Sequence, residues 1–359
     1  MRVGLAAAGS GGHVYPALAV ADALVASGLA NTDIVFFGGD RMEATAVPDA
    51  GYRFVGVDIH GFRRTISTAN VTLPIKVRNA SKRIAQEIRT ADLSVMIVFG
   101  GYISGPAAQA ARRCGIPVVV HEANAVPGMA NKLVAGKADL VLVGFRQALA
   151  KLRTGIVVGN PLRASFDTFD RTSEAEAAKS HYGIAAEAPV LGIVGGSLGA
   201  EALNDIAMTI ATTEPRPFHL LHVTGPRNAE AISPAASKVE GWTMVPYEDD
   251  MARFYAACDL VISRAGALTI AELEETSTPA IVVPLPAGKG YQRQNADDLV
   301  ASGGAMLIEQ GDPNAIVASA FALMADDAHR TSMAAKAGAT GHRHAAAEVA
   351  RLTRELLNV

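Results

Sequence analysis

Cysteine is scarce in this sequence, and long apolar runs are missing. The two cysteines, Cys114 and Cys258, lie too far apart to give the spacing of a metal site, so we predict two buried thiols in a reducing compartment. Because no stretch reaches about 18 uninterrupted apolar residues, no membrane-spanning helix is expected. The opening segment, MRVGLAAAGSGGH, has an apolar run that glycines interrupt too soon for a signal peptide. Together these absences predict a cytoplasmic location.

The sequence also lacks a strong charge imbalance. Its net charge of −3 argues against a dedicated nucleic-acid binder. No Asp-x-Asp metal motif stands in a suitable loop, and Glu248-Asp249-Asp250 precedes a predicted helix, where we interpret it as a cap. We therefore expect neither a metal nor a cofactor.

Glycine, by contrast, is abundant, with 34 among 359 residues, and half of the residues are hydrophobic. This composition suits an α/β protein with many tight turns, and the length favours two domains. Each half begins with an apolar strand and a glycine-rich turn into a helix, at 2–8 with 9–13 and at 190–194 with 195–199. We predict two Rossmann-like domains of parallel strands with a linker at 159–163.

Helix boundaries follow from proline and alanine. The first helix is predicted over Pro16 to Ser27, since proline is favoured near a first turn. Two alanine-rich helices, at about 313–325 and 330–358, are predicted to end the chain, the last one returning to the first domain. The predicted domains are therefore 1–160 together with 341–359, and 161–340.

Two glycine-rich turns of the first half are suited to anions. The first, Gly9-Ser10-Gly11-Gly12-His13, lets a phosphate approach the backbone at a helix start. It is not GxGxxG, it lacks the lysine of a Walker A loop, and no acidic residue ends the second strand, so a dinucleotide or ATP site is disfavoured. The second turn, Gly100 to Pro106, also opens a helix. Two such turns in one domain suit a pyrophosphate.

Polar residues follow several predicted strands at their carboxyl ends, where parallel sheets bind ligands. At the helix start that follows the first glycine turn, His13 should have a lowered pKa and a neutral ring able to accept a proton; a capping or hydrogen-bonding histidine is the alternative. Glu122 and Asn124 follow a very apolar strand, with helix capping as the alternative for Asn124. Arg41 and Glu43 are compatible with a solvated helix start and, equally, with an active-site role.

The stretch 261–295 combines a strand, a helix from about Ala267, and a second strand. In such a unit, the turn at 263–269 and the loop at 284–295 leave the same edge of a parallel sheet. The turn offers N–H groups for phosphate, Glu272 can accept protons from sugar hydroxyls, and amide side chains in the loop add polar contacts. The local pattern predicts a nucleotide-sugar pocket.

The turn at 195–199 permits another interpretation. Its sequence, Gly-Gly-Ser-Leu-Gly, fits the G-x-S-x-G elbow that presents a nucleophilic serine, here Ser197, in α/β-hydrolases. We disfavour a hydrolase because the elbow would belong to the second of two similar halves, and because phosphate binding explains the same turn.

Basic residues are concentrated in the segment 62–89. Seven lysines and arginines stand there against one acid, Glu87, with apolar residues interleaved. This composition suits docking on an anionic membrane surface. A solvated helix beside a loop is the alternative, because the alternation is irregular.

Seven ordered stretches resemble the motifs of the MurG family and span almost the whole chain. They are GSGGHVYPALAVADAL, GGDRMEA, FGGYISGPAAQAA, HEANAVPGMANKL, GNPLR, GGSLGAEALN and SRAGALTIAEL with PAIVVPLP and YQRQNA. The resemblance implies a GT-B fold, in which two Rossmann-like domains with parallel sheets face each other across a cleft. It also implies an inverting enzyme that transfers N-acetylglucosamine from UDP-GlcNAc to the C4 hydroxyl of lipid I, the lipid-linked muramyl-pentapeptide, making lipid II for peptidoglycan.

The family holds its donor mainly with the second domain. By resemblance, the donor-binding residues here are Ser10, Gly11, Gly12, Asn124, Arg163, Ser197, Glu248, Ala267, Leu268, Thr269, Glu272, Tyr291 and Gln292. Among these, Arg163 and Ser197 would lie near the diphosphate and Glu272 on the ribose. Two positions depart from the family: Tyr291 replaces the histidine of a His-Gln pair, and Glu248 replaces an apolar residue, so that only its backbone is assigned to uracil.

The acceptor site is implied in the first domain. Its pyrophosphate would lie at Gly9, Gly100, Gly101, Tyr102 and Ser104. His13 is the predicted base, with Glu122 or Asn124 as its partner. The expected partners are UDP-GlcNAc, lipid I and, through residues 62–89, anionic lipids on the cytoplasmic face of the bacterial plasma membrane, but no nucleic acid.

Other functional classes share parts of this pattern. A different GT-B transferase of UDP-sugars, or a UDP-GlcNAc epimerase, would have the donor site without the lipid-facing segment. A non-catalytic sensor of sugar nucleotides would bind UDP without turnover.

Overall fold

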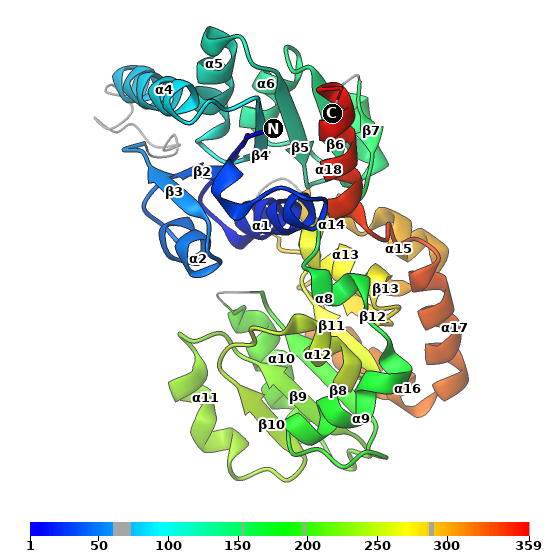
Figure 1. The fold of residues 1–359 in the computed structure, drawn as a ribbon. Coiled ribbons are helices and arrows are strands. Elements are labelled where there is room, and N and C mark those ends of the chain that lie inside the picture. The colour runs from blue at the N-terminus through cyan, green and yellow to red at the C-terminus, as the bar shows by residue number, and fades with distance from the viewer. Residues whose placement is uncertain (60–72, 153, 197–198, 287–290, 359) are drawn as a thin grey trace. The chain divides into compact units, whose positions relative to one another are not determined.

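The computed structural model describes residues 1–59, 73–152, 154–196, 199–286 and 291–358. The chain divides into two compact units (Figure 1). Unit 1 consists of Met1–Ala164 with His344–Val359, and unit 2 of Ser165–Arg343. Among the described residues, no helix has both the length and the apolar character needed to cross a membrane.

Unit 1 is built on a seven-stranded parallel sheet of order β3-β2-β1-β4-β5-β6-β7. The central strands are continuous apolar runs, such as VGLAA and VMIVFG, and every residue in them is buried, as expected when helices cover both faces of a parallel sheet. The strands are β1 Val3–Ala7, β2 Ile34–Gly38, β3 Arg53–Gly56, β4 Val95–Gly100, β5 Val118–Glu122, β6 Leu140–Val143 and β7 Ile156–Val157.

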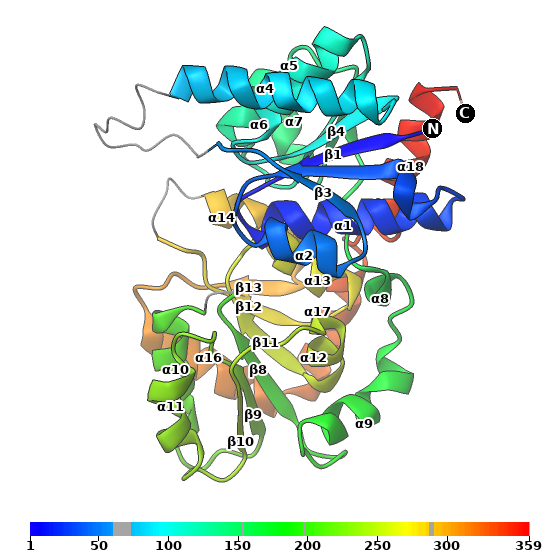
Figure 2. The same ribbon diagram turned by 60° about the vertical axis from the view of Figure 1, so that its left-hand side comes forward.

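Helices cover both faces of this sheet (Figure 2). The helices of unit 1 are α1 Gly11–Ala26, α2 Glu43–Asp49, α4 Leu73–Thr90, α5 Ser104–Cys114, α6 Met129–Ala135, α7 Leu149–Leu152 and α18 Ala345–Leu356, with 3₁₀ turns η1 Asn31–Asp33 and η2 Arg146–Ala148. One core lies between the sheet and α1, α2 and α18. Another lies between the opposite face and α4, α5 and α6.

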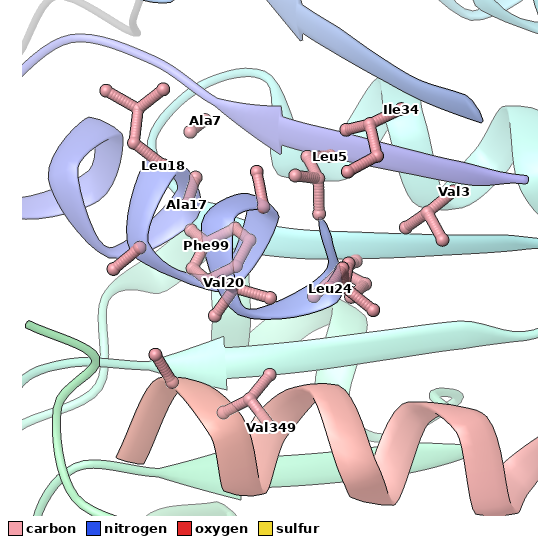
Figure 3. Packing of buried hydrophobic residues seen from close by; sticks show 14 of the residues in the cluster. Val3, Leu5, Ala7, Ala17, Leu18, Val20, Leu24, Ile34, Phe99 and Val349 are labelled. Carbon is pink, nitrogen blue, oxygen red and sulfur yellow. The ribbon is translucent and has the colours of Figure 1, made fainter. Parts of the chain in front are cut away.

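The C-terminal helix packs into the first of these cores. Val349 of α18 is fully buried in the same cluster as Leu24 of α1 and Phe99 of β4 (Figure 3). The single helix predicted over 330–358 is therefore wrong, because two helices, α17 Asp327–Gly338 and α18, occupy this range. The interruption includes Gly341 and His344, and His344 has a left-handed φ of 61°, which a helix cannot continue through.

Unit 2 repeats the architecture with a six-stranded parallel sheet of order β10-β9-β8-β11-β12-β13. Its strands are β8 Val190–Val194, β9 His219–Val223, β10 Trp242–Val245, β11 Leu260–Ser263, β12 Ala280–Val282 and β13 Ala305–Leu307. Its helices are α8 Ala164–Asp167, α9 Arg171–His181, α10 Glu201–Thr212, α11 Ala229–Ala236, α12 Met251–Ala257, α13 Ala267–Glu275, α14 Tyr291–Asn295, α15 Asp297–Ser302, α16 Pro313–Ala325 and α17 Asp327–Gly338.

Three local expectations need correction. Helix α1 begins at Gly11, five residues before Pro16, and therefore contains the proline. Because proline has no N–H, the helix loses one hydrogen bond, the one to the carbonyl oxygen of Gly12. The end of the 284–295 loop forms the short helix α14. Cys258 is buried as expected, but Cys114 is partly exposed, since it ends α5 at the rim of its layer.

Candidate active site

His13 lies in the first turn of α1, at the carboxyl end of β1. Its Nδ1 is 3.2 Å from the carbonyl oxygen of Ala8 and 3.4 Å from Oγ of Ser10. Because a carbonyl oxygen only accepts hydrogen bonds, the neutral ring carries its hydrogen on Nδ1 and keeps its lone pair on Nε2. A Cβ at Gly100 would lie 2.7 Å from Nε2, so the glycine makes room for the ring. Nε2 is thus the nitrogen that can take a proton.

The environment of His13 favours its neutral form. Burial lowers the pKa of His13 from its ordinary value of 6.5, and this effect exceeds three opposing influences. The opposing influences, in falling order, are the negative charge of Glu122, the hydrogen bond to Ala8 and the charge of Glu43. A histidine that is neutral at physiological pH has the protonation state of a general base.

Glu122 organises the loop that follows β5. Its Oε1 accepts hydrogen bonds from the backbone N–H of Asn124, at 2.9 Å, and from the side-chain amide of Asn124, at 3.2 Å. Its Oε2 accepts from the N–H of Gly128 and from Nδ2 of Asn131, each at 3.0 Å. In the part of the chain that the structure describes, Glu122 shares no hydrogen bond with His13. It acts on His13 through its charge, and Asn124 serves this loop rather than a helix cap.

The two glycine turns of unit 1 present a specific set of N–H groups. The N–H of Gly9 donates to Glu43 at 3.2 Å, and that of Gly100 donates to Oγ of Ser104 at 3.0 Å. Two members of the predicted acceptor site therefore already use their N–H groups within unit 1. Within the described residues, the N–H groups of 10–12 at the start of α1 and of 101–103 before α5 have no acceptor. Since β1 and β4 are neighbours, these groups form one concentration of positive potential suited to an anion.

Arg41 and Glu43, at the start of α2, have different surroundings in the structure. Arg41 is exposed, as a solvated helix start predicts. Glu43 has only 1% of its surface exposed and accepts hydrogen bonds from neighbouring loops, so a solvated role is wrong for it.

A cavity of about 700 Å³ lies in unit 2 beside the turn after β8 and the turn after β11. Gly195, Gly196, Arg264 and Thr269 are among its lining residues. Helix α13 begins here, with Gly266 as its N-cap and Thr269 in its first turn. The backbone N–H groups at such a start suit a phosphate.

Arg264 adds a buried positive charge to this cavity. Its guanidinium donates to the carbonyl oxygens of Val283, at 3.1 Å, and Pro284, at 3.4 Å, and to Oε1 of Gln310 at 2.7 Å. These acceptors are neutral, and no ion pair of Arg264 is found among the described residues. A buried guanidinium without a carboxylate favours an anionic ligand.

Gln292 of α14 also lines this cavity, and hydrogen bonds of Glu272 and Asn295 hold α13 and α14 in place. Glu272 accepts a hydrogen bond from the fully buried hydroxyl of Tyr255 at 2.9 Å, which fixes its carboxylate on α13. Oε1 of Gln292 accepts from the N–H of Leu285 at 2.8 Å. Nδ2 of Asn295 donates to the carbonyl oxygen of Ala265 at 3.2 Å, which ties α14 to the turn before α13.

A second cavity of unit 2, of about 540 Å³, adjoins the end of β10 and includes Tyr247 and Glu248 in its wall. The hydroxyl of Tyr182 donates to one oxygen of Glu248 at 2.6 Å, and the N–H of Asp250 donates to the other at 2.7 Å. Both carboxylate oxygens are thus engaged by the protein, which leaves the backbone of this loop for a ligand. Asp250 caps α12 by accepting from the N–H of Arg253, so the cap interpretation is confirmed.

Arg163 lies in unit 1, and other predicted residues fall outside the described residues. The guanidinium of Arg163 lies over the ring of Tyr15, 4.8 Å from its centre, in unit 1. Ser197, with the elbow interpretation that depends on it, and residues 62–72 of the basic segment are outside the described residues. Among the described residues, no group of three or more His, Cys, Asp and Glu side chains could hold a metal ion.

Sequence reasoning missed two residues. Asn131 stands in the HEANAVPGMANKL motif, three residues after Gly128. Its place in that motif could have marked it as a site residue. Gln310 gave none, because its contact with Arg264 joins positions far apart in the sequence.

We predict that His13 titrates below pH 6.5 and that Glu122→Gln lowers its pKa further, because that carboxylate stabilises the protonated ring. The measurement is an NMR titration of the imidazole signals, which also identifies the tautomer. The imidazole signals of the exposed His329 serve as the internal reference in both spectra. A His13 that titrates above pH 6.5, or that carries its hydrogen on Nε2, would contradict this description of the site.

Comparison with known proteins agrees with the two-unit organisation. The model of the glycosyltransferase family 28 N-terminal domain matches residues 3–143, and that of the family 28 C-terminal domain matches residues 190–349. A curated relative from Rhodococcus opacus is 38% identical over 98% of this chain and 95% of its own length. It is named UDP-N-acetylglucosamine--N-acetylmuramyl-(pentapeptide) pyrophosphoryl-undecaprenol N-acetylglucosamine transferase.

Solved structures place the fold in the same group. The crystal structure of Acinetobacter baumannii MurG is 29% identical, covers 99% of both chains and gives a TM-score of 0.76. A UDP-GlcNAc 2-epimerase from Neisseria meningitidis gives 0.69 at 15% identity over 100% of both chains, and this likeness concerns the fold alone. The predicted class, α/β with two Rossmann-like domains of parallel strands, is confirmed. The chain is therefore a glycosyltransferase with the GT-B fold, and it belongs to the MurG family within glycosyltransferase family 28.

Proposed function

We propose that this enzyme transfers N-acetylglucosamine from UDP-GlcNAc to the C4 hydroxyl of polyprenyl-pyrophosphoryl-MurNAc-pentapeptide, with inversion at the anomeric carbon. The names of relatives that match almost the whole chain support the two substrates. The observation that carries the chemistry is the neutral His13 beside two helix N-termini at one edge of the unit 1 sheet.

The donor belongs to unit 2 in this proposal. Its diphosphate would lie at the start of α13, where Arg264 and the N–H groups of the first turn supply positive potential. Glu272 would accept the ribose hydroxyls, Gln292 would meet the sugar, and the backbone at Glu248 would meet uracil. The engagement of both Glu248 oxygens supports assigning only its backbone to the base.

The acceptor and the base belong to unit 1. The acceptor's pyrophosphate would bind the N–H groups of 10–12 and 101–103, near Nε2 of His13. This proposal moves Ser10, Gly11 and Gly12, which the resemblance assigned to the donor, to the acceptor. Nε2 would take the proton of the C4 hydroxyl while the C4 oxygen forms a bond to the anomeric carbon. The bond from that carbon to the diphosphate oxygen breaks in the same step, and UDP leaves with the electron pair. One displacement inverts the configuration, and Arg264 with α13 would stabilise the charge on the leaving diphosphate.

Unit 1 also has features suited to a peripheral position on the cytoplasmic face of an anionic membrane. Helix α4, the described part of the basic segment, exposes Lys82, Arg83 and an apolar Ile75 with 63% of its surface accessible. Helices α4, α5 and α6 cover the same face of the sheet (Figure 2), and α6 exposes Met129 and Leu133 one turn apart. Basic and apolar side chains together on one surface are suited to anionic lipids.

We predict that His13→Ala lowers the kcat of transfer by roughly 10²- to 10⁴-fold, because the C4 hydroxyl loses its general base. The assay follows labelled N-acetylglucosamine from UDP-GlcNAc to a short-chain lipid I analogue, with UDP affinity measured by calorimetry. UDP affinity should stay unchanged, and His329→Ala, at an exposed position, should behave as the native chain.

A loss below tenfold for His13→Ala would give the base role to another residue. Donor epimerisation without an acceptor, or UDP binding without any transfer, would favour the epimerase or the sensor and overturn the proposed function.

Charge reversal on α4 should weaken membrane binding. We predict that Lys82→Glu with Arg83→Glu reduces binding to vesicles of anionic phospholipid and leaves turnover of a soluble acceptor unchanged, because only the surface charge is altered. The control, Lys151→Glu with Lys238→Glu, makes the same charge change at exposed positions outside α4. Equal vesicle binding by the two double variants in a sedimentation assay would contradict the assignment. Arg63, another basic residue of the segment, lies outside the described residues, and Lys76 already pairs with Asp58 at 3.0 Å.

A further inference from the structure

The carboxylate of Glu43 joins three loops of unit 1. Its Oε2 accepts from the N–H of Gly9 at 3.2 Å, and its Oε1 accepts from the N–H of Gly39 at 3.0 Å. Oε1 also accepts from the hydroxyl of Tyr102 at 3.2 Å. These three residues follow β1, β2 and β4, which are neighbours in the sheet.

The arrangement requires both the buried charge and the absence of a side chain at position 39. A Cβ at Gly39 would lie 2.2 Å from the hydroxyl oxygen of Tyr102, so any other residue there would displace the tyrosine. An ionised carboxylate with 1% of its surface exposed is stable only when hydrogen bonds replace its water. The described structure supplies two backbone donors and one phenol, and burial beside this carboxylate raises the pKa of Tyr102, which keeps the phenol a donor.

The position of these donors bears on the acceptor site. Gly9 is the first residue of the turn whose next three N–H groups, at 10–12, have no acceptor in the described chain. Tyr102 is the middle residue of the group 101–103. One carboxylate therefore holds both halves of the anion-binding edge, through the backbone of one turn and the side chain of the other.

We propose that Glu43 is a positioning residue for the acceptor: it holds the two glycine turns so that the N–H groups of 10–12 and 101–103 are presented together to the pyrophosphate. The proposal deepens the proposed function and rests on it for the identity of the acceptor. It also places the anion away from Gly9 and Gly100, whose N–H groups are taken by Glu43 and Ser104.

The physical reason is preorganisation. A turn with three glycines among 9–12 has many conformations when nothing holds it, and a ligand that orders such a turn loses affinity by the entropy of ordering. Without Glu43, the neighbouring turns would lose their shared acceptor, and the pyrophosphate itself would have to order them.

The test compares the native chain with Glu43→Ala and Glu43→Gln. Alanine at position 43 removes all three hydrogen bonds. Glutamine keeps one oxygen as an acceptor, but its NH₂ group replaces the other oxygen and would face a backbone N–H, which cannot accept a hydrogen bond. The control is Asp22→Ala, which removes another tyrosine–carboxylate bond of unit 1, from Tyr52 at 2.5 Å, on the exposed side of α1. We measure KM for a short-chain lipid I analogue, KM for UDP-GlcNAc, kcat, and the binding of inorganic pyrophosphate by calorimetry with UDP at saturation to fill the donor site.

Glu43→Ala should raise the acceptor KM and weaken pyrophosphate binding by roughly ten- to hundredfold, the range expected for losing bonds to a charged group. Glu43→Gln should fall between Glu43→Ala and the native chain. The KM for UDP-GlcNAc should stay within about twofold in every variant, and Asp22→Ala should match the native chain throughout.

Unchanged acceptor KM and pyrophosphate binding in both Glu43 variants would overturn the proposal, as would tighter pyrophosphate binding, which would mean that the carboxylate competes with the anion. A residue needed only for folding would lower the active fraction, and hence kcat, without raising the acceptor KM. If the native chain transfers no sugar, the proposed function fails, while the pyrophosphate measurement still decides the role of Glu43.

Discussion

The loops at the carboxyl ends of parallel strands carry backbone groups that the sheet does not pair, and in both units a buried charged side chain binds some of them. In each turn, a side chain engages part of the backbone and leaves the rest for a ligand. Glu43, Ser104 and Glu122 do this in unit 1 by accepting from backbone N–H groups. The N–H groups that remain at the starts of α1 and α5 lie where the two helix dipoles are positive.

Unit 2 holds its loops with a group of the opposite charge, which donates to carbonyl oxygens instead of accepting from N–H groups. Arg264 donates to carbonyl oxygens and to Gln310, so its loops are held by a buried cation rather than by a buried carboxylate. The difference has a chemical consequence under the proposed function. The diphosphate in unit 2 gains charge as it leaves and benefits from a fixed positive group, whereas the acceptor pyrophosphate in unit 1 keeps its charge during the reaction and needs only to be held.

His13 connects these electrostatics to the chemistry. Its ring is held by a carbonyl of the first turn, faces a glycine of the second, and feels the charges of Glu122 and Glu43 without a hydrogen bond to either in the described chain. Burial and negative charge act on its pKa in opposite directions. The balance leaves the ring neutral, and the negative groups stabilise the imidazolium that proton transfer would create.

Much of this architecture could be predicted from local patterns in the sequence. Apolar runs followed by glycine gave the strand β8 and the start of α13, because both signals are local. The break between α17 and α18 was missed, since the alanine-rich pattern continues on both sides of His344. The contacts of Glu43 with Gly9 and Tyr102, and that of Gln310 with Arg264, could not be predicted, because each depends on strands that come together only when the sheet forms.

The linkage and configuration of the disaccharide product distinguish a single displacement at the C4 hydroxyl from every other outcome. NMR of the product made from UDP-GlcNAc, whose sugar is α-linked, and a short-chain lipid I analogue would give both. We expect a β-linked N-acetylglucosamine on the C4 oxygen of the muramyl residue, as a single displacement with His13 as base requires. An α-linked sugar, attachment at another hydroxyl, or free N-acetylglucosamine in place of the disaccharide would contradict it.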